Sequence, residues 1–305
     1  MIEFIEKVLK TEKHYQKKAE ILLRQVRFSV KGVSLYKPIF IVGCSRAGTT
    51  LVYKTFSESK ELGSLQRETH DFWASLHPLE QLAWNSHSIP ASMASDKDRS
   101  STSCLFYTQT GSCRIVDKNN QNGLSIPYLY ALFPEANFIF IRRNPGDNIE
   151  SLIRGWGKPN EFGTWSKNLP EKVAIDKGDY KQWCFFLAES WRDYCDSPIE
   201  DVCAFQYASM NKAILNARDI VPQAQWHEIA YEEIVADPVQ SFKHLFESCD
   251  LKFDLALQKH CKSVLERPYN TFSGIAVDKW KQGEFCERIE LALVPIDSIC
   301  KQLGY

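Results

Sequence analysis

Short apolar runs of strand length alternate along the chain with longer segments whose apolar residues recur at helical spacing. Residues 38–42 are continuously apolar up to Gly43, which is typical of a strand buried on both faces of a parallel sheet. Four further candidate strands follow at residues 62–66, 113–116, 137–141 and 225–230. Because strands that alternate with helices require crossover connections, we expect these five strands to form one parallel sheet.

Helices are predicted between and around these strands, where apolar positions are spaced three or four residues apart. The predicted ranges are 2–27, 49–58, 126–133, 238–249 and 284–303, with a further helix from Pro145. Residues 180–218 predict two helices broken near Pro198. Residues 85–112, which are rich in Ser and Thr, and residues 266–283 are expected to be loops. The first of these loops is a candidate for a mobile cover over a site.

No internal repeat, low-complexity segment or linker divides this pattern. We therefore expect a single α/β domain over residues 1–305, with a central parallel β-sheet flanked by helices. The composition agrees with this fold class. Hydrophobic residues make up 44% and charged residues 25% of the chain, close to the globular average, which excludes disordered and fibrous classes.

Charge and cysteine usage narrow the class of protein further. The formal net charge is -1, which argues against broad nucleic-acid binding but permits a local basic pocket for a small anion. The 10 cysteines include no C-x-x-C pair, so the usual zinc and redox spacings are missing and reduced thiols are expected. We expect neither a signal peptide nor a transmembrane segment, no metal, and a cytoplasmic location.

The strongest local motif is Gly43-Cys-Ser-Arg-Ala-Gly48-Thr-Thr, between the first predicted strand and a helix. This context turns backbone N–H groups and a helix N-terminus toward an anion, as in a P-loop-like strand–loop–helix. Thr49 stands where a Walker A loop carries its lysine, so a kinase or ATPase would lack its main cation. Arg46 can supply that charge instead. The alternative is a tight turn that merely requires glycine.

A second motif follows the strand predicted at residues 137–141. Arg143-Asn-Pro145 is followed after five residues by Ser151, which places an arginine at the carboxyl end of a strand, where open α/β sheets bind ligands. Ser151 falls in the second turn of the next helix. A guanidinium and a hydroxyl are suitable ligands for a terminal phosphate. The alternative is a surface arginine pair with an ordinary helical serine.

Two phosphate-type sites at strand ends imply a ligand with two separated anionic groups. The pair G-x-x-R-x-G-T-T and R-N-P-x5-S resembles the 5′- and 3′-phosphate-binding motifs of sulfotransferases that use 3′-phosphoadenosine 5′-phosphosulfate (PAPS). The resemblance covers residues 36–155 closely and continues loosely through residues 226–238 and 278–280. It is nearest to the bacterial and tyrosylprotein branch. It implies a PAPS-binding core at 36–155 and a helical, C-terminal part at 156–305.

The resemblance also implies roles for individual residues. Ser45, Arg46, Ala47, Gly48, Thr49 and Thr50 would hold the 5′-phosphosulfate, whereas Arg143 and Ser151 would hold the 3′-phosphate. Tyr231 matches a nucleotide-contacting tyrosine, with a core aromatic as the alternative. Lys279 and Trp280 match a late lysine–tryptophan pair in which the lysine reaches a cofactor phosphate.

Four residues are candidates for catalysis by the same resemblance. Glu68 would be the general base, since relatives carry a glutamate after the second strand, and a base must lie within hydrogen-bond reach of the acceptor hydroxyl. His70 is the competing base, or a residue that orients the acceptor. Lys118 would stabilise charge on the transferring group, together with Arg46. The alternatives are a solvated turn carboxylate and a surface lysine.

The predicted activity is sulfuryl transfer from PAPS to a hydroxyl-bearing acceptor, which leaves 3′,5′-ADP. Four tryptophans are candidates for an acceptor pocket or for the core: Trp73, Trp84, Trp156 and Trp165. Two other classes of protein stay open. One is an atypical P-loop kinase that uses ATP with Mg²⁺, and the other is a non-catalytic nucleotide-binding protein of the same fold.

Overall fold

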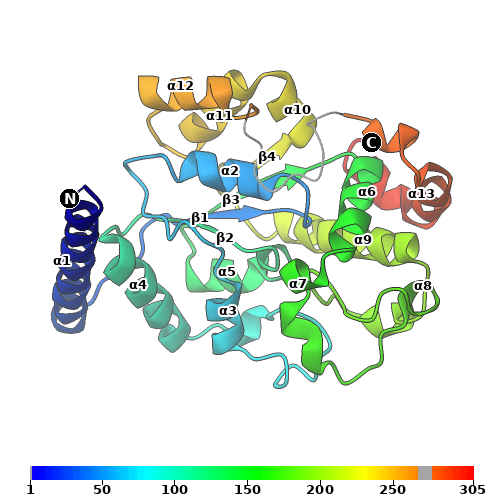
Figure 1. Cartoon of the computed structure of the whole chain (residues 1–305), viewed down its shortest axis with the longest axis horizontal. Coiled ribbons are helices and arrows are strands. Elements are labelled where there is room, and N and C mark those ends of the chain that lie inside the picture. The colour runs from blue at the N-terminus through cyan, green and yellow to red at the C-terminus, as the bar shows by residue number, and fades with distance from the viewer. Residues whose placement is uncertain (1, 267–276) are drawn as a thin grey trace.

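The computed structural model describes residues 2–266 and 277–305, and it has the expected architecture of one α/β domain around a parallel sheet (Figure 1). The sheet has four strands in the order β2-β1-β3-β4. They are β1 (Ile39–Val42), β2 (Val116–Lys118), β3 (Asn137–Arg142) and β4 (Trp226–Ala230). All three pairings are parallel, so the carboxyl ends of the strands share one edge.

The two faces of the sheet pack against different side chains. On β1 and β3 the residues Phe40, Phe138 and Phe140 belong to one buried cluster, whereas Ile39 and Ile41 belong to another. This division follows from the alternation of side chains along a strand. Every residue of β1 is nevertheless buried, which explains why its sequence is a continuous apolar run.

The helices cover both faces of the sheet and one end of the molecule (Figure 1). Before β3 they are α1 (Ile2–Lys31), α2 (Thr49–Phe56), α3 (His70–Leu76), α4 (Asp96–Thr110) and α5 (Ile126–Leu132). Between β3 and β4 they are α6 (Pro145–Trp156), α7 (Pro159–Phe162), α8 (Ile175–Gly178) and α9 (Ile199–Arg218). After β4 they are α10 (Tyr231–Ala236), α11 (Pro238–Ser248), α12 (Leu255–Ser263), α13 (Cys286–Leu293) and α14 (Asp297–Gln302). Within the described residues, no helix combines the length and apolar character needed to cross a membrane.

Two of the predicted strands need correction. Residues 62–66 make only an isolated bridge from Gly63 to Ile115, because the positive φ of Gln66, 58°, turns the chain away from the sheet. The strand predicted at 113–116 is displaced toward the C-terminus. Lys118 is therefore the last residue of β2 itself and is buried.

The prediction of a mobile cover at residues 85–112 was wrong, because most of this segment forms α4. Ser95 caps the helix by accepting a hydrogen bond from the Asp98 N–H at 3.1 Å, and Gly111 ends it at a φ of 77°. The hydroxyls that suggested a loop bond back to the helix, as Thr102 does to the Asp98 carbonyl at 2.8 Å. Such bonds let Ser and Thr residues remain within a helix.

Two predicted helical regions are interrupted. Residues 183–188 are buried, but the positive φ values of Phe185 and Ser190, both 68°, exclude a continuous helix before α9. In the C-terminal segment, a 3₁₀ turn that contains Pro295 separates α13 from α14. The loop predicted at 266–283 lies largely outside the described residues, which resume at Val277.

Candidate active site

The glycine-bearing loop joins β1 to α2 at the carboxyl edge of the sheet, as the sequence predicts. A side chain at Gly43 would place its Cβ 2.6 Å from the Ile141 carbonyl oxygen of β3, so only glycine permits this approach. Gly48 has a φ of 102° and lies against the ring of Tyr231, where a Cβ would overlap the ring. Asn148 of α6 donates a hydrogen bond to the Ser45 carbonyl at 2.9 Å and fixes the start of the loop.

The structure brings the two predicted phosphate motifs together. The Arg143 guanidinium donates from Nη1 to the Arg46 carbonyl at 2.7 Å. Arg46 in turn donates from Nε to the Ser151 hydroxyl at 3.2 Å. Tyr231, the first residue of α10, lies with its ring centroid 4.6 Å from the Arg143 guanidinium carbon. Four residues from three separately predicted parts of the chain therefore lie together at one end of the sheet.

Positive charge is concentrated at this junction. Burial and, after it, the nearby charge of Arg143 together lower the pKa of Arg46 to about 10. Arg46 therefore remains charged at neutral pH, beside the guanidinium of Arg143. Two like charges at close range are costly unless an anion offsets them.

Several donors at this junction are suited to bind an anion. Ser45 Oγ, Arg143 Nε and Trp280 Nε1 are buried, and within the described residues they have no hydrogen-bond partner. Unsatisfied buried donors are rare, since each loses its bonds to water. The residues present therefore fit a nucleotide with charged phosphate groups.

The late lysine–tryptophan pair also reaches this site. The Asp147 carboxylate of α6 accepts hydrogen bonds from the backbone N–H groups of Asp278, at 2.7 Å, and Trp280, at 3.2 Å. Trp280 is buried against Gly146. Burial lowers the pKa of Lys279, and the charge of Arg143 lowers it further. Lys279 thus lies close enough to Arg143 to share its electrostatic environment.

The candidate base and the candidate charge-stabilising lysine form an ion pair. Lys118 Nζ donates to Glu68 Oε1 at 2.6 Å and to the Thr50 hydroxyl at 3.4 Å. Lys118 is 5% exposed. Burial raises the pKa of Glu68, but the charge and hydrogen bond of Lys118 outweigh it and hold that pKa below its usual value. The carboxylate is consequently ionised at neutral pH and lies next to the loop.

His70 lies within electrostatic range of Glu68 and adds to the lowering of its pKa, but it pairs with a different group. It begins α3 with an exposed side chain, and its Nε2 is 3.2 Å from the Asp71 carboxylate. The geometry therefore joins Glu68, rather than His70, to Lys118 and the loop.

Asp117 is a positioning residue that the sequence analysis missed. Its carboxylate is fully buried and accepts hydrogen bonds from Thr69 Oγ1 at 2.7 Å, Trp73 Nε1 at 3.1 Å and Asn122 Nδ2 at 3.2 Å. These bonds tie the end of β2 to the segment that carries Glu68. The available signal was an acidic residue directly before Lys118 in an otherwise apolar strand.

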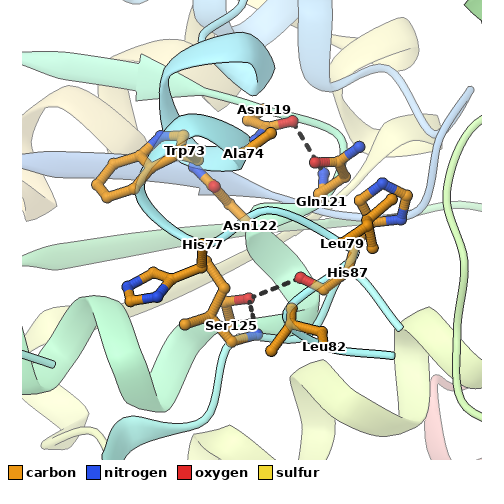
Figure 2. Close-up of a pocket in the computed structure, with 11 residues that line it drawn as sticks. Trp73, Ala74, His77, Leu79, Leu82, His87, Asn119, Gln121, Asn122 and Ser125 are labelled. Carbon is orange, nitrogen blue, oxygen red and sulfur yellow. Dashed lines mark hydrogen bonds between the residues drawn. The ribbon is translucent and has the colours of Figure 1, made fainter. Parts of the chain in front are cut away.

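A small cavity of about 20 Å³ lies beyond the Lys118 end of β2 (Figure 2). Its apolar wall is formed by Trp73, Ala74, Leu79, Leu82 and Ile89. Its polar wall is formed by His77, His87, Asn119, Gln121, Asn122 and Ser125. No carboxylate, lysine or arginine is among these lining residues. The cavity is therefore suited to an uncharged group.

His87 and Asn119 supply hydrogen-bond donors to this cavity. Leu187 donates its backbone N–H to His87 Nδ1 at 2.8 Å, so the proton of the neutral imidazole is on Nε2. Burial lowers the pKa of His87 to about 3. Asn119 Nδ2 is buried and, in the described part of the chain, has no partner.

The other tryptophan candidates have structural roles. Trp156 is buried and donates to Gln206 at 3.1 Å. Trp165 packs edge-on against His87, with 4.6 Å between ring centroids. The carbonyl of Trp84 accepts a hydrogen bond from Trp191 at 2.7 Å. Among the four, only Trp73 lines the cavity itself.

Comparison with known proteins identifies relatives of this fold. The model of the sulfotransferase family matches residues 38–255. The sulfotransferase domain of the Synechococcus PCC 7002 olefin synthase superposes with a TM-score of 0.54 and 17% identity, over 90% of this chain and 97% of that domain. Sulfotransferase STF9 from Mycobacterium avium gives a TM-score of 0.51 and 14% identity, over 92% and 80%. No curated protein sequence matched the chain.

Proposed function

Because the chain belongs to the sulfotransferase family, we propose that it transfers the sulfuryl group of PAPS to an acceptor hydroxyl and releases 3′,5′-ADP. The observation that carries this proposal is the junction of two basic motifs, in which Arg143 bonds to the Arg46 carbonyl and Arg46 bonds to Ser151. A ligand with phosphate groups at two separated positions accounts for both motifs at once. ATP carries all its phosphates on the 5′ side, so it would leave the second motif, Arg143 and Ser151, without a phosphate to bind.

In this proposal each part of the junction binds a different part of the nucleotide. The backbone N–H groups of residues 45–50 and the guanidinium of Arg46 hold the 5′-phosphosulfate at the N-terminus of α2. Arg143 Nε and the Ser151 hydroxyl hold the 3′-phosphate. Tyr231, Trp280 and Lys279 enclose the nucleotide from the C-terminal half of the chain.

The transfer itself requires a base beside the sulfuryl group and cations around it. Glu68 takes the proton of the acceptor hydroxyl while the hydroxyl oxygen forms its bond to sulfur. The bond from sulfur to the bridging oxygen breaks, and its electron pair stays on the 5′-phosphate. Arg46 and Lys118 stabilise the charge that develops there. The contacts of Lys118 with both Glu68 and Thr50 of the loop support this role.

The acceptor enters from the side of Glu68 that faces the cavity. Asn119 and Gln121, which line the cavity, flank Asn120, whose backbone is hydrogen-bonded to Glu68. At about 20 Å³ the cavity has room for a group about the size of a water molecule. Its neutral lining favours a small uncharged part of the acceptor there, since burying an ion without a partner is costly. Asn119 Nδ2 and His87 Nε2 can donate to an oxygen of that part.

A thermal-shift comparison of nucleotides tests the cofactor class. We expect 3′,5′-ADP to raise the melting temperature well above the shift caused by equal concentrations of ADP or ATP with Mg²⁺. A larger shift with ATP and Mg²⁺ would favour the kinase alternative. If the chain binds 3′,5′-ADP tightly but releases no 3′,5′-ADP from PAPS when mixtures of hydroxyl-bearing acceptors are added, the non-catalytic alternative is favoured.

A further inference from the structure

The outward face of α1 carries an apolar strip that the rest of the domain leaves uncovered. Among the described side chains of this helix, Leu22, Leu23, Val26 and Val30 are 62%, 71%, 64% and 76% exposed. At 100° per residue these four positions fall within about 100° of the helix circumference. They form a continuous patch, unlike the isolated exposed leucines that are normal on protein surfaces.

This strip is separate from the face that anchors α1 to the domain. Phe28 packs near Tyr107 of α4, with 6.5 Å between ring centroids. Arg24 donates to the Thr108 carbonyl at 3.4 Å. The helix, which lies at the outer side of α4 (Figure 1), is thus held in place by one face, while the strip lies on the opposite part of its circumference and is exposed.

Positive charge surrounds the strip. Residues 14–31 contain five basic residues, Lys17, Lys18, Arg24, Arg27 and Lys31, against one acidic residue, Glu20. The net charge of this stretch is therefore +4, whereas that of the whole chain is -1. Helical spacing places Lys18 along one border of the strip and Arg27 along the other, whereas Lys17, Arg24 and Lys31 lie nearer the anchored face. Arg24 pairs with Glu20 at 2.8 Å, which neutralises the one acidic side chain of this stretch.

The charge pattern decides between the possible occupants. A second copy of α1 on this face would bring two basic borders together, and like charges at close range repel. An anionic bilayer surface complements the borders, with lipid phosphates near the Lys and Arg heads and the strip in the acyl boundary. We propose that α1 docks the protein reversibly onto membranes that contain anionic phospholipid, with the helix lying in the plane of the surface.

The position of α1 keeps this docking separate from the active site. In Figure 1 the helix lies at one end of the molecule, and α6 and α7, beside the phosphate loop, lie toward the other. Docking therefore leaves the loop accessible. The proposal does not depend on the cofactor or on the reaction.

Vesicle co-sedimentation of the full chain tests this proposal. We expect at least roughly tenfold tighter binding to vesicles of phosphatidylcholine with phosphatidylglycerol than to phosphatidylcholine alone, and weaker binding at high salt. The double variant Leu23→Glu, Val26→Glu should lose at least about tenfold in affinity, because both side chains would carry charge into the acyl boundary. The variant Leu291→Glu is the matched control, since Leu291 is 74% exposed on α13 and outside the strip.

Three outcomes would overturn the proposal. They are equal binding to both kinds of vesicle, equal binding by the strip variant and the control, and a dimer in light scattering that only the strip variant disrupts. Circular dichroism melting of both variants checks that they fold. Because these substitutions are on solvent-exposed positions, we expect melting temperatures within a few degrees of the unmodified chain.

Discussion

The nucleotide side and the acceptor side of the sheet edge are built by different means. On the nucleotide side, Arg46 and Arg143 stand at junctions of a regular strand with a regular helix, and Ser151 lies in the second turn of α6. Arg46 is hydrogen-bonded to both of the others. On the acceptor side, Glu68 and His87 stand on irregular segments. The first side is specified by short local motifs, whereas the second depends on contacts between distant segments.

The two sides also differ in charge. Guanidiniums gather on the nucleotide side, while the cavity of the acceptor side is lined by uncharged groups and a histidine held neutral by burial. The Lys118–Glu68 pair lies at the boundary. We therefore expect substitutions on one side to change nucleotide affinity, and substitutions on the other to change turnover or acceptor use.

The largest effect is expected at the boundary, from Glu68→Gln. This variant keeps the shape of the side chain but removes its basicity, so turnover should fall by about 10²–10⁴-fold. The affinity for 3′,5′-ADP should stay within about twofold. The measurements are steady-state kinetics with any acceptor that supports turnover, and calorimetric titration of 3′,5′-ADP.

His70→Asn is the companion variant to Glu68→Gln. It should lower turnover less than Glu68→Gln does and should mainly raise the KM for the acceptor. Near-normal turnover in Glu68→Gln together with an inactive His70→Asn would reverse the assignment of the base.

On the nucleotide side the largest effect is expected from Gly48→Ala. The new methyl group would meet the Tyr231 ring at a positive φ, which should lower the free energy of unfolding by about 2–4 kcal/mol. The displaced loop should also weaken 3′,5′-ADP binding at least about tenfold. Gly178→Ala is the matched control, because Gly178 has a φ of +100° but open space around it.

Urea denaturation and nucleotide titration measure both consequences. If the two glycine variants lose the same stability, the packing of Tyr231 against the loop contributes nothing beyond backbone strain. Our account of that contact would then be wrong.

A smaller and more selective effect is expected from Arg143→Ala. Loss of the charged donor should weaken 3′,5′-ADP binding at least about tenfold, since hydrogen bonds to charged groups contribute about 1.5–3 kcal/mol. Binding of 5′-AMP, which lacks the 3′-phosphate, should change little. Calorimetric titration of both nucleotides measures the difference. Equal losses would mean that Arg143 acts through the Arg46 carbonyl on the whole loop.

At neutral pH the smallest effect is expected at His87, whose protonation matters only in acid. Its pKa is lowered to about 3 in the folded chain, against about 6.5 when unfolded. The unfolded chain therefore binds the proton first, so this contribution to stability is present above pH ~6.5 and decreases by up to ~1.4 kcal/mol per pH unit below it. In His87→Gln the slope of unfolding free energy against pH should be shallower between about pH 6 and pH 4. An unchanged slope in urea titrations would contradict a buried neutral His87.

The sequence was a sufficient guide where local chemistry determines local structure. Gly43 and Gly48 at a strand end, and Pro145 at the start of a helix, predict the two strand–loop–helix junctions. These residue types allow few other backbone conformations. The parallel sheet and the positions of Arg46, Arg143 and Ser151 followed from those junctions.

Elsewhere the tertiary structure decided the outcome. Residues 183–188 are apolar enough for a helix, yet they are buried in an irregular conformation. Contacts with α7 and α9 stabilise this conformation. One of them is the hydrogen bond that Gln206 Nε2 of α9 donates to the Cys184 carbonyl at 2.9 Å. The cavity is formed by residues that are up to 52 positions apart. The sequence proposed Glu68 and Lys118 separately, but it did not show that Asp117 bonds to Thr69 and Trp73, which lie far from it in the chain and next to Glu68.

Lys118 carries one positive charge that must serve two anions in the proposed reaction. Before the donor binds, the Lys118 ammonium pairs with the Glu68 carboxylate and keeps it a poor proton acceptor. When phosphosulfate oxygens arrive beside Thr50, they compete for the same ammonium, and the burial of Glu68 then acts with less opposition to raise its pKa. The strength of the base is in this way coupled to the presence of the donor, and an acceptor that binds first meets a weaker base than one that binds second.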